Sequence, residues 1–278
     1  MKIKIVTDSS ADVTPEIRSQ LNIVPLLVRF GEKEYLDGID LDYDSFYEKL
    51  ESNTDFPTTS QANPSTFQNI YEQTLQEYDV AIVIVVSSKL AGTYQSACLA
   101  AEDYEGKIFV VDSLNGSAGT GLLAKRGLEL IEQDYSVEEI VNILDKEREA
   151  ICVFGIPSTL DYLKRGGRIS SVSALAGSLL SIKPILGVRD GVIVSIDKTR
   201  GIKKAFRILN ETIDSQGGID ENKPRAVCYS GNSDAILKDY LAHSDSRWNH
   251  ADIVRICSSI GTHLGPGAVL VAYYKKQL

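Results

Sequence analysis

The feature that most constrains the fold of this chain is the alternation of short apolar segments with longer helical segments over its first 150 residues. Residues 80–86 form a continuous, largely β-branched run, which is typical of a strand covered on both faces of a parallel sheet. Parallel strands need crossover connections, and helical segments of about 10–15 residues provide them. Residues 1–150 are therefore predicted to form an α/β lobe with a Rossmann-like parallel sheet.

Periodicity and capping residues set the limits of the predicted elements. Thr14 followed by Pro15 is a typical helix start, and Ser136 followed by Glu139 forms a capping box. The strands predicted in this lobe are residues 2–6, 23–30, 80–86 and 108–112. The helices predicted in it are residues 15–22, 44–52, 64–77, 93–104, 116–133 and 137–149. Residues 57–61 are predicted to be a polar loop.

After about residue 150 the pattern changes. Arg189, Asp190 and Gly191 separate two strand-like segments and predict the turn of an antiparallel hairpin. The predicted strands are residues 151–156, 182–188, 192–196, 225–229, 253–257 and 268–274. The predicted helices are residues 158–165, 172–181, 202–216 and 233–242. Residues 151–278 are therefore predicted to form a second, α+β lobe.

Composition excludes several classes of protein. Lys and Arg total 29 against 38 Asp and Glu, and this net charge of -9 argues against a nucleic-acid-binding protein. With 43% hydrophobic and 24% charged residues, the chain resembles ordinary globular proteins. The longest apolar run, residues 80–86, is far shorter than the ~18 residues of a membrane span, and the start of the chain alternates like a strand rather than a signal peptide.

The cysteines and histidines favour a reduced compartment and no metal. The four cysteines are widely spaced in apolar contexts: Cys98, Cys152, Cys228 and Cys257. That spacing favours free thiols over a disulfide or zinc framework. The three histidines are scattered: His243, His250 and His263. A soluble, cytoplasmic protein without a metal is predicted.

The common catalytic motifs are mostly absent. Gly119, Gly121 and Ala124 match a loosened dinucleotide fingerprint, but they lie inside a helical pattern. Glycines that allow close packing of the helix on the sheet are the better interpretation. Asp8 ends the first strand, on the crevice side of the sheet. It is either a site residue or an acid that caps the following loop and helix.

Two hydroxyl-rich turns precede predicted helices, at residues 58–61 and 87–93. Both are expected near the carboxyl edge of the sheet, where helix N-termini present free N–H groups. Hydroxyls and such N–H groups can hold an anion without a basic side chain. They can equally be ordinary helix caps, and both interpretations stay open.

Residues 258–267 carry three glycines and a proline around His263, which predicts a turn that brings the backbone close to another group. A single histidine is more often structural than a ligand, but its place between two apolar strands leaves both roles open.

Five segments, in this order and across almost the whole chain, resemble the DegV family of bacterial fatty-acid-binding proteins. They are residues 6–12 (VTDSSAD), 59–61 (TSQ), 87–97 (SSKLAGTYQSA), 163–170 (LKRGGRIS) and 261–267 (GTHLGPG). The resemblance implies a two-lobed protein that encloses one long-chain fatty acid, with the carboxylate between the lobes and the tail in the second lobe. It also implies delivery of the acid to a separate kinase subunit, which forms the acyl phosphate.

By motif match, Thr59 and its neighbour Ser60 are expected at the carboxylate, with Thr59 as hydroxyl donor and His263 close to the head group. Arg168 resembles a residue near the mouth of the site that faces the partner. Many relatives have serine at the position of Ala91, and alanine removes that donor. The N–H groups of Ala91, Gly92 and Thr93 remain, with the hydroxyl of Ser88 or Thr93 as a substitute.

A lipid tail would supply most of the binding free energy. Burying ~15 methylenes at ~0.8 kcal/mol each is worth roughly 12 kcal/mol before ordering costs, so the carboxylate needs only neutral donors. Six apolar residues are candidates for the wall of a tunnel, although ordinary core packing explains them equally well: Leu175, Leu179, Leu180, Ile182, Ile185 and Leu186.

Two functional hypotheses follow. The first is a carrier without catalytic turnover or cofactor, which buries a fatty acid and offers its carboxylate to a kinase subunit. The second is a small-molecule phosphotransferase or hydrolase that uses Asp8 and His263.

Overall fold

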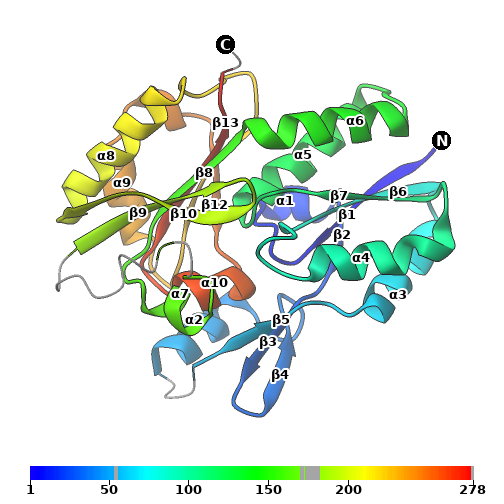
Figure 1. Cartoon of the computed structure of the whole chain (residues 1–278), viewed down its shortest axis with the longest axis horizontal. Helices are drawn as coiled ribbons and strands as arrows, with labels where there is room; N and C mark the ends of the chain where they lie inside the picture. Colours follow the sequence, from blue (N-terminus) through cyan, green and yellow to red (C-terminus); the bar gives the residue numbers. More distant parts are fainter. Residues whose placement is uncertain (53–55, 170–171, 173–181, 277–278) are drawn as a thin grey trace.

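The computed structural model describes residues 1–52, 56–169, 172 and 182–276. Its first sheet is formed by β1 (Ile3–Asp8), β2 (Asn22–Val24), β6 (Val80–Val85) and β7 (Ile108–Asp112). These strands are all parallel, in the order β2-β1-β6-β7 (Figure 1). The direction of winding reverses between β1 and β6. The crevice at the carboxyl ends of these two strands is therefore the topological switch point, where α/β sheets bind ligands.

Helices cover both faces of this parallel sheet (Figure 1). One face packs on α3 (Pro64–Leu75) and α4 (Thr93–Ala101). The other packs on α5 (Ala118–Glu132) and α6 (Val137–Glu147). The capping box predicted at Ser136 is confirmed at the start of α6.

The second sheet contains six strands in the order β10-β9-β8-β13-β11-β12. Their bounds are β8 (Ile151–Ile156), β9 (Ile182–Arg189), β10 (Val192–Arg200), β11 (Arg225–Tyr229), β12 (Asp252–Arg255) and β13 (Val269–Tyr274). The predicted hairpin is confirmed as β9 and β10. One face packs on α8 (Ile202–Ser215) and α9 (Ala235–Ala242), and the other on α5. The α/β fold class with a second, mixed sheet is confirmed, whereas a domain boundary near residue 150 stays a prediction.

A small antiparallel sheet, β4-β3-β5, lies beside these two sheets (Figure 1). Its strands are β3 (Leu27–Phe30), β4 (Lys33–Leu36) and β5 (Thr58–Ser60). The helix α10 (Ser258–Leu264) packs on this sheet, on α2 (Tyr43–Ser52) and on α7 (Asp161–Arg165). The remaining short helices are α1 (Pro15–Arg18), η1 (Glu102–Tyr104), η2 (Arg148–Ala150) and η4 (Ser246–Trp248).

Several predicted elements are wrong near this small sheet. Residues 23–30 are not one strand, because Pro25, which has no N–H to donate, separates β2 from β3, and the two strands join different sheets. Residues 58–60 are not a loop, because Thr59 pairs with Val28. The helix that begins at Pro15 ends at Arg18, so that Asn22 can start β2.

Two predictions concern later segments. Residues 258–264 are helix α10 rather than a turn, and only Gly265 and Gly267 have the positive φ angles of the predicted turn. The apolar helix predicted over residues 172–181 falls, apart from Val172, outside the described residues.

Glycines let α5 lie close to its surroundings on both sides. A Cβ on Gly119 would lie 2.6 Å from Val153 Cγ2 in β8. A Cβ on Gly121 would lie 2.3 Å from the backbone oxygen of Asp12, and one on Gly127 would lie 2.9 Å from Ile5 Cδ1 in β1. These distances support close packing as the role of the first two glycines.

None of the helices in the described ranges is long and apolar enough to cross a membrane. All four cysteines are free. Within the same ranges, no cluster of three or more His, Cys, Asp or Glu side chains could hold a metal ion.

We expect Gly121→Ala to lower the free energy of unfolding by roughly 1–3 kcal/mol, because the new methyl group would overlap a backbone oxygen that cannot move alone. Gly116→Ala is a matched control just before the same helix, since its Cβ would meet nothing closer than 3.5 Å. Urea denaturation of both variants measures the difference. Equal stabilities would show that α5 is not tightly packed at Gly121.

Candidate functional site

A cavity of about 380 Å³ lies at the topological switch point. On one side it is lined by the loops that follow β1 and β6 and by the start of α5. On the other side it is lined by β8, β9, β10, β13 and α10. Its volume is within the range of small-molecule sites, about 300–1,000 Å³. Hydroxyl groups, a histidine and an arginine gather at one part of it, and the remaining wall is mostly apolar.

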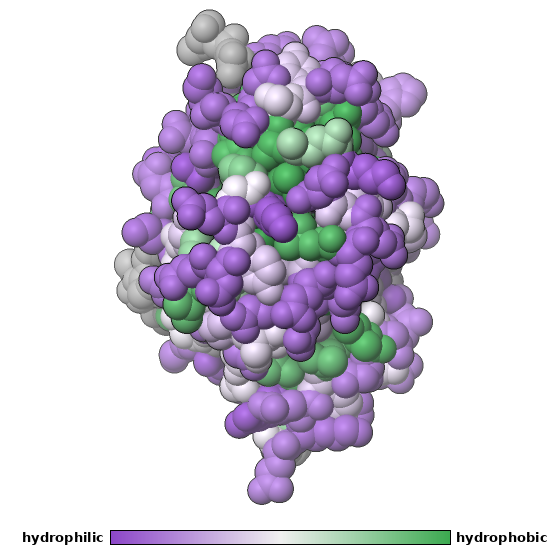
Figure 2. All heavy atoms as spheres, turned by 90° about the vertical axis from the view of Figure 1, so that its right-hand side faces the viewer, coloured by the Kyte–Doolittle hydropathy of each residue, from purple (hydrophilic) through white to green (hydrophobic). Residues whose placement is uncertain are grey.

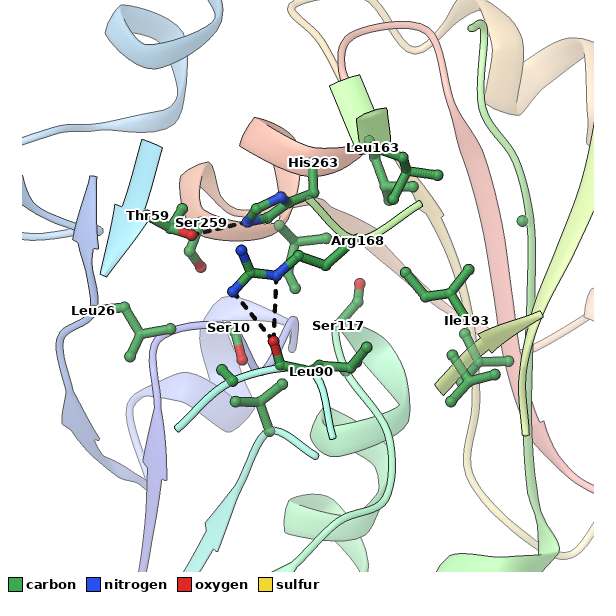
Figure 3. A pocket seen from close by; sticks show the side chains of 18 of the residues that line it. Ser10, Leu26, Thr59, Leu90, Ser117, Leu163, Arg168, Ile193, Ser259 and His263 are labelled. Atoms are coloured by element: carbon green, nitrogen blue, oxygen red, sulfur yellow. Dashed lines mark hydrogen bonds between the residues drawn. The ribbon is translucent and has the colours of Figure 1, made fainter. Parts of the chain in front are cut away.

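A threonine and a histidine meet in the polar part of the cavity (Figure 3). Thr59 Oγ1 in β5 and His263 Nε2 in α10 are 2.8 Å apart and share a hydrogen bond. The two residues are 204 positions apart in the sequence, so the packing of α10 on the small sheet makes this pair.

The imidazole of His263 is neutral at physiological pH. Burial, assisted by the nearby Arg168 guanidinium, lowers the pKa of His263 to about 4. Its Nδ1 is buried and has no hydrogen-bond partner among the described residues. A Cβ on Gly166 would lie 2.1 Å from His263 Nδ1. The imidazole ring therefore packs directly on the backbone at the end of α7.

Arg168 brings a positive charge into the polar part of the cavity (Figure 3). Its Nε and one terminal nitrogen donate to the carbonyl oxygen of Leu90 at 3.3 and 3.2 Å, and the other donates to that of Gly166 at 2.8 Å. No ion pair to a carboxylate is found for it within the described part of the chain. The expectation of neutral donors alone therefore overlooked a cation in the cavity wall. A partner-facing role for Arg168 stays a prediction.

The loop between β6 and α4 supplies further polar groups. Thr93 Oγ1 is buried and has no hydrogen-bond partner in the described structure. Gln61 lies over Gly92 and donates to Ser96 Oγ at 3.0 Å. Ser88 is not among the residues that line the cavity, and its N–H donates to Asp112.

The structure therefore brings the residues expected at the carboxylate, and Arg168, to one cavity, whereas Ser88 and Asp8 do not line it. The residues brought together are Thr59, Ser60, Ala91, Gly92, Thr93, Arg168 and His263. Their role in binding a carboxylate stays a prediction. Four other polar residues line it that were not predicted individually: Ser10, Gln61, Ser117 and Ser259. Ser10 and Gln61 belong to segments that resemble the family, whereas Ser117 carries no signal beyond its place between a strand and a helix.

Asp8 is a structural carboxylate in this arrangement. One of its oxygens accepts hydrogen bonds from the N–H and the hydroxyl of Ser10, and the other accepts from the N–H of Val86 at 2.7 Å. Burial raises the pKa of Asp8. The side chain is fully buried behind Ser10 and does not line the cavity, so it braces the loops around the switch point.

A large part of the apolar wall comes from the sheet that contains β8. Val153, Gly155, Leu186, Val188 and Leu270 line the cavity.

The six candidates for a tunnel wall have different outcomes. Leu186 lines the cavity. Ile185 packs on the opposite face of the sheet, with α8, so its prediction is wrong, and Ile182 does not line the cavity. Leu175, Leu179 and Leu180 lie outside the described residues.

Fold and cavity together define an α/β protein with an amphipathic pocket between two sheets. Comparison with known proteins agrees with this class. The family model described as "Uncharacterised protein, DegV family" matches residues 2–276. The chain belongs to the DegV family.

Known members resemble the chain over nearly its full length. A DegV domain-containing protein of Caldanaerobacter subterraneus subsp. tengcongensis is 34% identical, with 99% of each chain covered. The structure of a DegV family protein from Thermus thermophilus, described as fatty acid binding, superposes with a TM-score of 0.88 at 32% identity and covers 99% of this chain and 100% of its own. The structure of Bacillus subtilis DegV, described as a fatty acid binding protein, superposes with a TM-score of 0.85 at 33% identity and with the same coverage.

We expect His263→Gln to change how stability depends on pH. Because the folded chain keeps His263 neutral, stability should fall as the pH drops from about 6.5 to 4, where only the unfolded chain takes up this proton. The free energy of unfolding of the wild type should fall by about 1.4 kcal/mol per pH unit in this range, and His263→Gln should not show this fall. Unfolding free energies of both proteins at several pH values give the difference, in which other titrations cancel. A pH-independent difference would show that His263 is solvated and titrates normally.

Proposed function

We propose that this chain binds one long-chain fatty acid, with the carboxylate at Thr59, His263 and Arg168 and the tail along the apolar wall. The observation that carries this proposal is one cavity with a cation and hydroxyl groups at one part and aliphatic side chains along the rest. Fatty acid binding by relatives in the DegV family supports it.

The charges favour an anionic head group. The hydrogen bonds that Arg168 makes within the described structure all go to carbonyl oxygens, so its charge lacks the counter-ion that a carboxylate would supply. Hydrogen bonds between charged partners are worth about 1.5–3 kcal/mol, more than neutral ones. The tail supplies the larger share of the free energy through burial of its methylenes.

The hydroxyl of Thr93 is the better substitute for the donor missing at Ala91. Thr93 lines the cavity and its Oγ1 lacks a partner in the described chain, whereas Ser88 does not line the cavity. An unpaired buried hydroxyl costs about 1–3 kcal/mol, and a ligand oxygen would remove that cost.

We further propose that the chain is a cytoplasmic carrier that presents the carboxylate to a kinase subunit and does not turn over substrate itself. Asp8 uses both carboxylate oxygens in structural hydrogen bonds and does not line the cavity. The alternative is a phosphotransferase or hydrolase that uses Asp8 and His263. Asp8 is not available in the cavity to act as its acid.

The first test is lipid extraction and mass spectrometry of the freshly purified chain. We expect about one fatty acid per chain, and strong loss of it in Gly155→Leu, because a leucine there projects into the cavity. Gly155→Ala is the matched control: its Cβ meets Val269 O at 3.4 Å and Leu270 Cβ at 3.7 Å, which are ordinary contacts, so the sheet tolerates it. A wild-type chain purified without lipid, with turnover of its own, would favour the enzyme instead.

The second test concerns the head group. We expect Thr59→Val to retain the bound acid but to slow formation of acyl phosphate by the fatty acid kinase subunit roughly tenfold or more, the effect of losing one hydrogen bond to a charged group. Thr58→Val is the control, since Thr58 precedes it in β5 but is exposed and does not line the cavity. Equal rates for both variants and the wild type would refute the role of Thr59.

A further inference from the structure

Ser117 has an unusual backbone conformation immediately before α5. It is the residue before the helix, with φ 54° and ψ -136°, a conformation that non-glycine residues rarely adopt. Its hydroxyl does not cap the helix, which is the ordinary role of serine at this position. Such strain persists where the surrounding structure holds a side chain in place. Ser117 is 3% exposed and lines the cavity.

The hydroxyl of Ser117 is paired with a buried carboxyl instead. Ser117 Oγ lies 2.5 Å from Oδ2 of Asp12, which is 4% exposed. The other oxygen of Asp12 accepts the N–H of Cys257, the residue before α10, at 2.8 Å. One carboxyl thus joins the starts of the two helices that carry Ser117 and His263 to the cavity.

The protonation of Asp12 decides which way the Ser117 hydroxyl can point, because the hydroxyl has one proton to give. When Asp12 is ionised, Ser117 must donate to it and offers only lone pairs to the cavity. When Asp12 is protonated, the carboxyl can donate to Ser117 Oγ, and the serine proton is free for a ligand. Figure 3 labels Ser117 among the residues that line the cavity, together with Arg168 and Leu90.

We propose that Ser117 is a further ligand-binding residue, which donates to the anionic head group when Asp12 is protonated, so that binding of the anion is coupled to uptake of a proton by Asp12. This inference rests on the proposed binding of a fatty acid. The proton moves from solvent to an Asp12 oxygen, and no covalent bond to the ligand forms.

The surroundings of Asp12 bring this titration near neutral pH. Burial raises its pKa to about 7, although the hydrogen bonds from Ser117 and Cys257 act in the opposite direction. Four neutral groups and one carboxyl face it: the thiols of Cys257 and Cys228, the phenols of Tyr43 and Tyr47, and Asp37. Burial raises the pKa of each of these groups, which keeps the thiols and phenols protonated at neutral pH. A ligand carboxylate nearby would raise the pKa of Asp12 further, and by linkage a rise in pH would weaken binding.

The experiment measures hexadecanoate binding to the delipidated full-length chain between pH 6 and 8.5. If only the form with protonated Asp12 binds, the affinity of the wild type should fall by about 30-fold over this range. Asp12→Asn keeps both hydrogen bonds and always donates to Ser117, so its affinity should not show this fall. The ratio of wild-type to Asp12→Asn affinity removes the titration of hexadecanoate itself.

Two serine variants complete the test. Ser117→Ala should bind weakly and without the Asp12-dependent fall. Ser88→Ala is the control, since Ser88 does not line the cavity and its N–H donates to Asp112, so this variant should keep the wild-type pH profile. The same pH profile in Asp12→Asn or Ser117→Ala as in the wild type would overturn the inference. Absence of hexadecanoate binding by the wild type at every pH would overturn the proposed function and this inference with it.

Discussion

The packing of α5 between two sheets is the constraint on which the rest of the structure depends. The helix is buried against the parallel sheet through Ile5 and against the mixed sheet through Val153. Glycines on the helix allow both contacts, since side chains at these positions would push the sheets apart. The first turn of α5 is therefore held between the two sheets, and the cavity opens beside it.

Buried carboxyl groups hold the second wall of the cavity. The helix α10 has only seven residues and would not be stable alone. Asp12 accepts the N–H of Cys257, and Asp37 accepts those of Ser258 and Ser259. Carboxyl oxygens accept these free N–H groups of the first turn whether or not the carboxyl is ionised. Two loops from the first forty residues thus fix the helix that carries His263, so the cavity needs both ends of the chain.

This dependence on distant partners explains which features the sequence could predict. The parallel sheet and the β9–β10 hairpin have local signals, in the run at residues 80–86 and in the turn at Gly191, and both were predicted. The strand β5 has only three polar residues, and it is a strand because β3 pairs with it. Likewise α10 depends on Asp12 and Asp37, which no local pattern connects to residues 258–264.

The same reasoning applies to the site. Thr59 and His263 were selected through resemblance to a family, because no periodicity relates residues 204 positions apart. Resemblance to the family placed Arg168 near the mouth of the site, and no local pattern indicates which groups its side chain contacts. Its inward position follows from two backbone carbonyls, of Leu90 and Gly166, that accept its N–H groups. These neutral acceptors orient the guanidinium without cancelling its charge, and this uncompensated charge beside an aliphatic wall is the physical basis of the proposed fatty acid site.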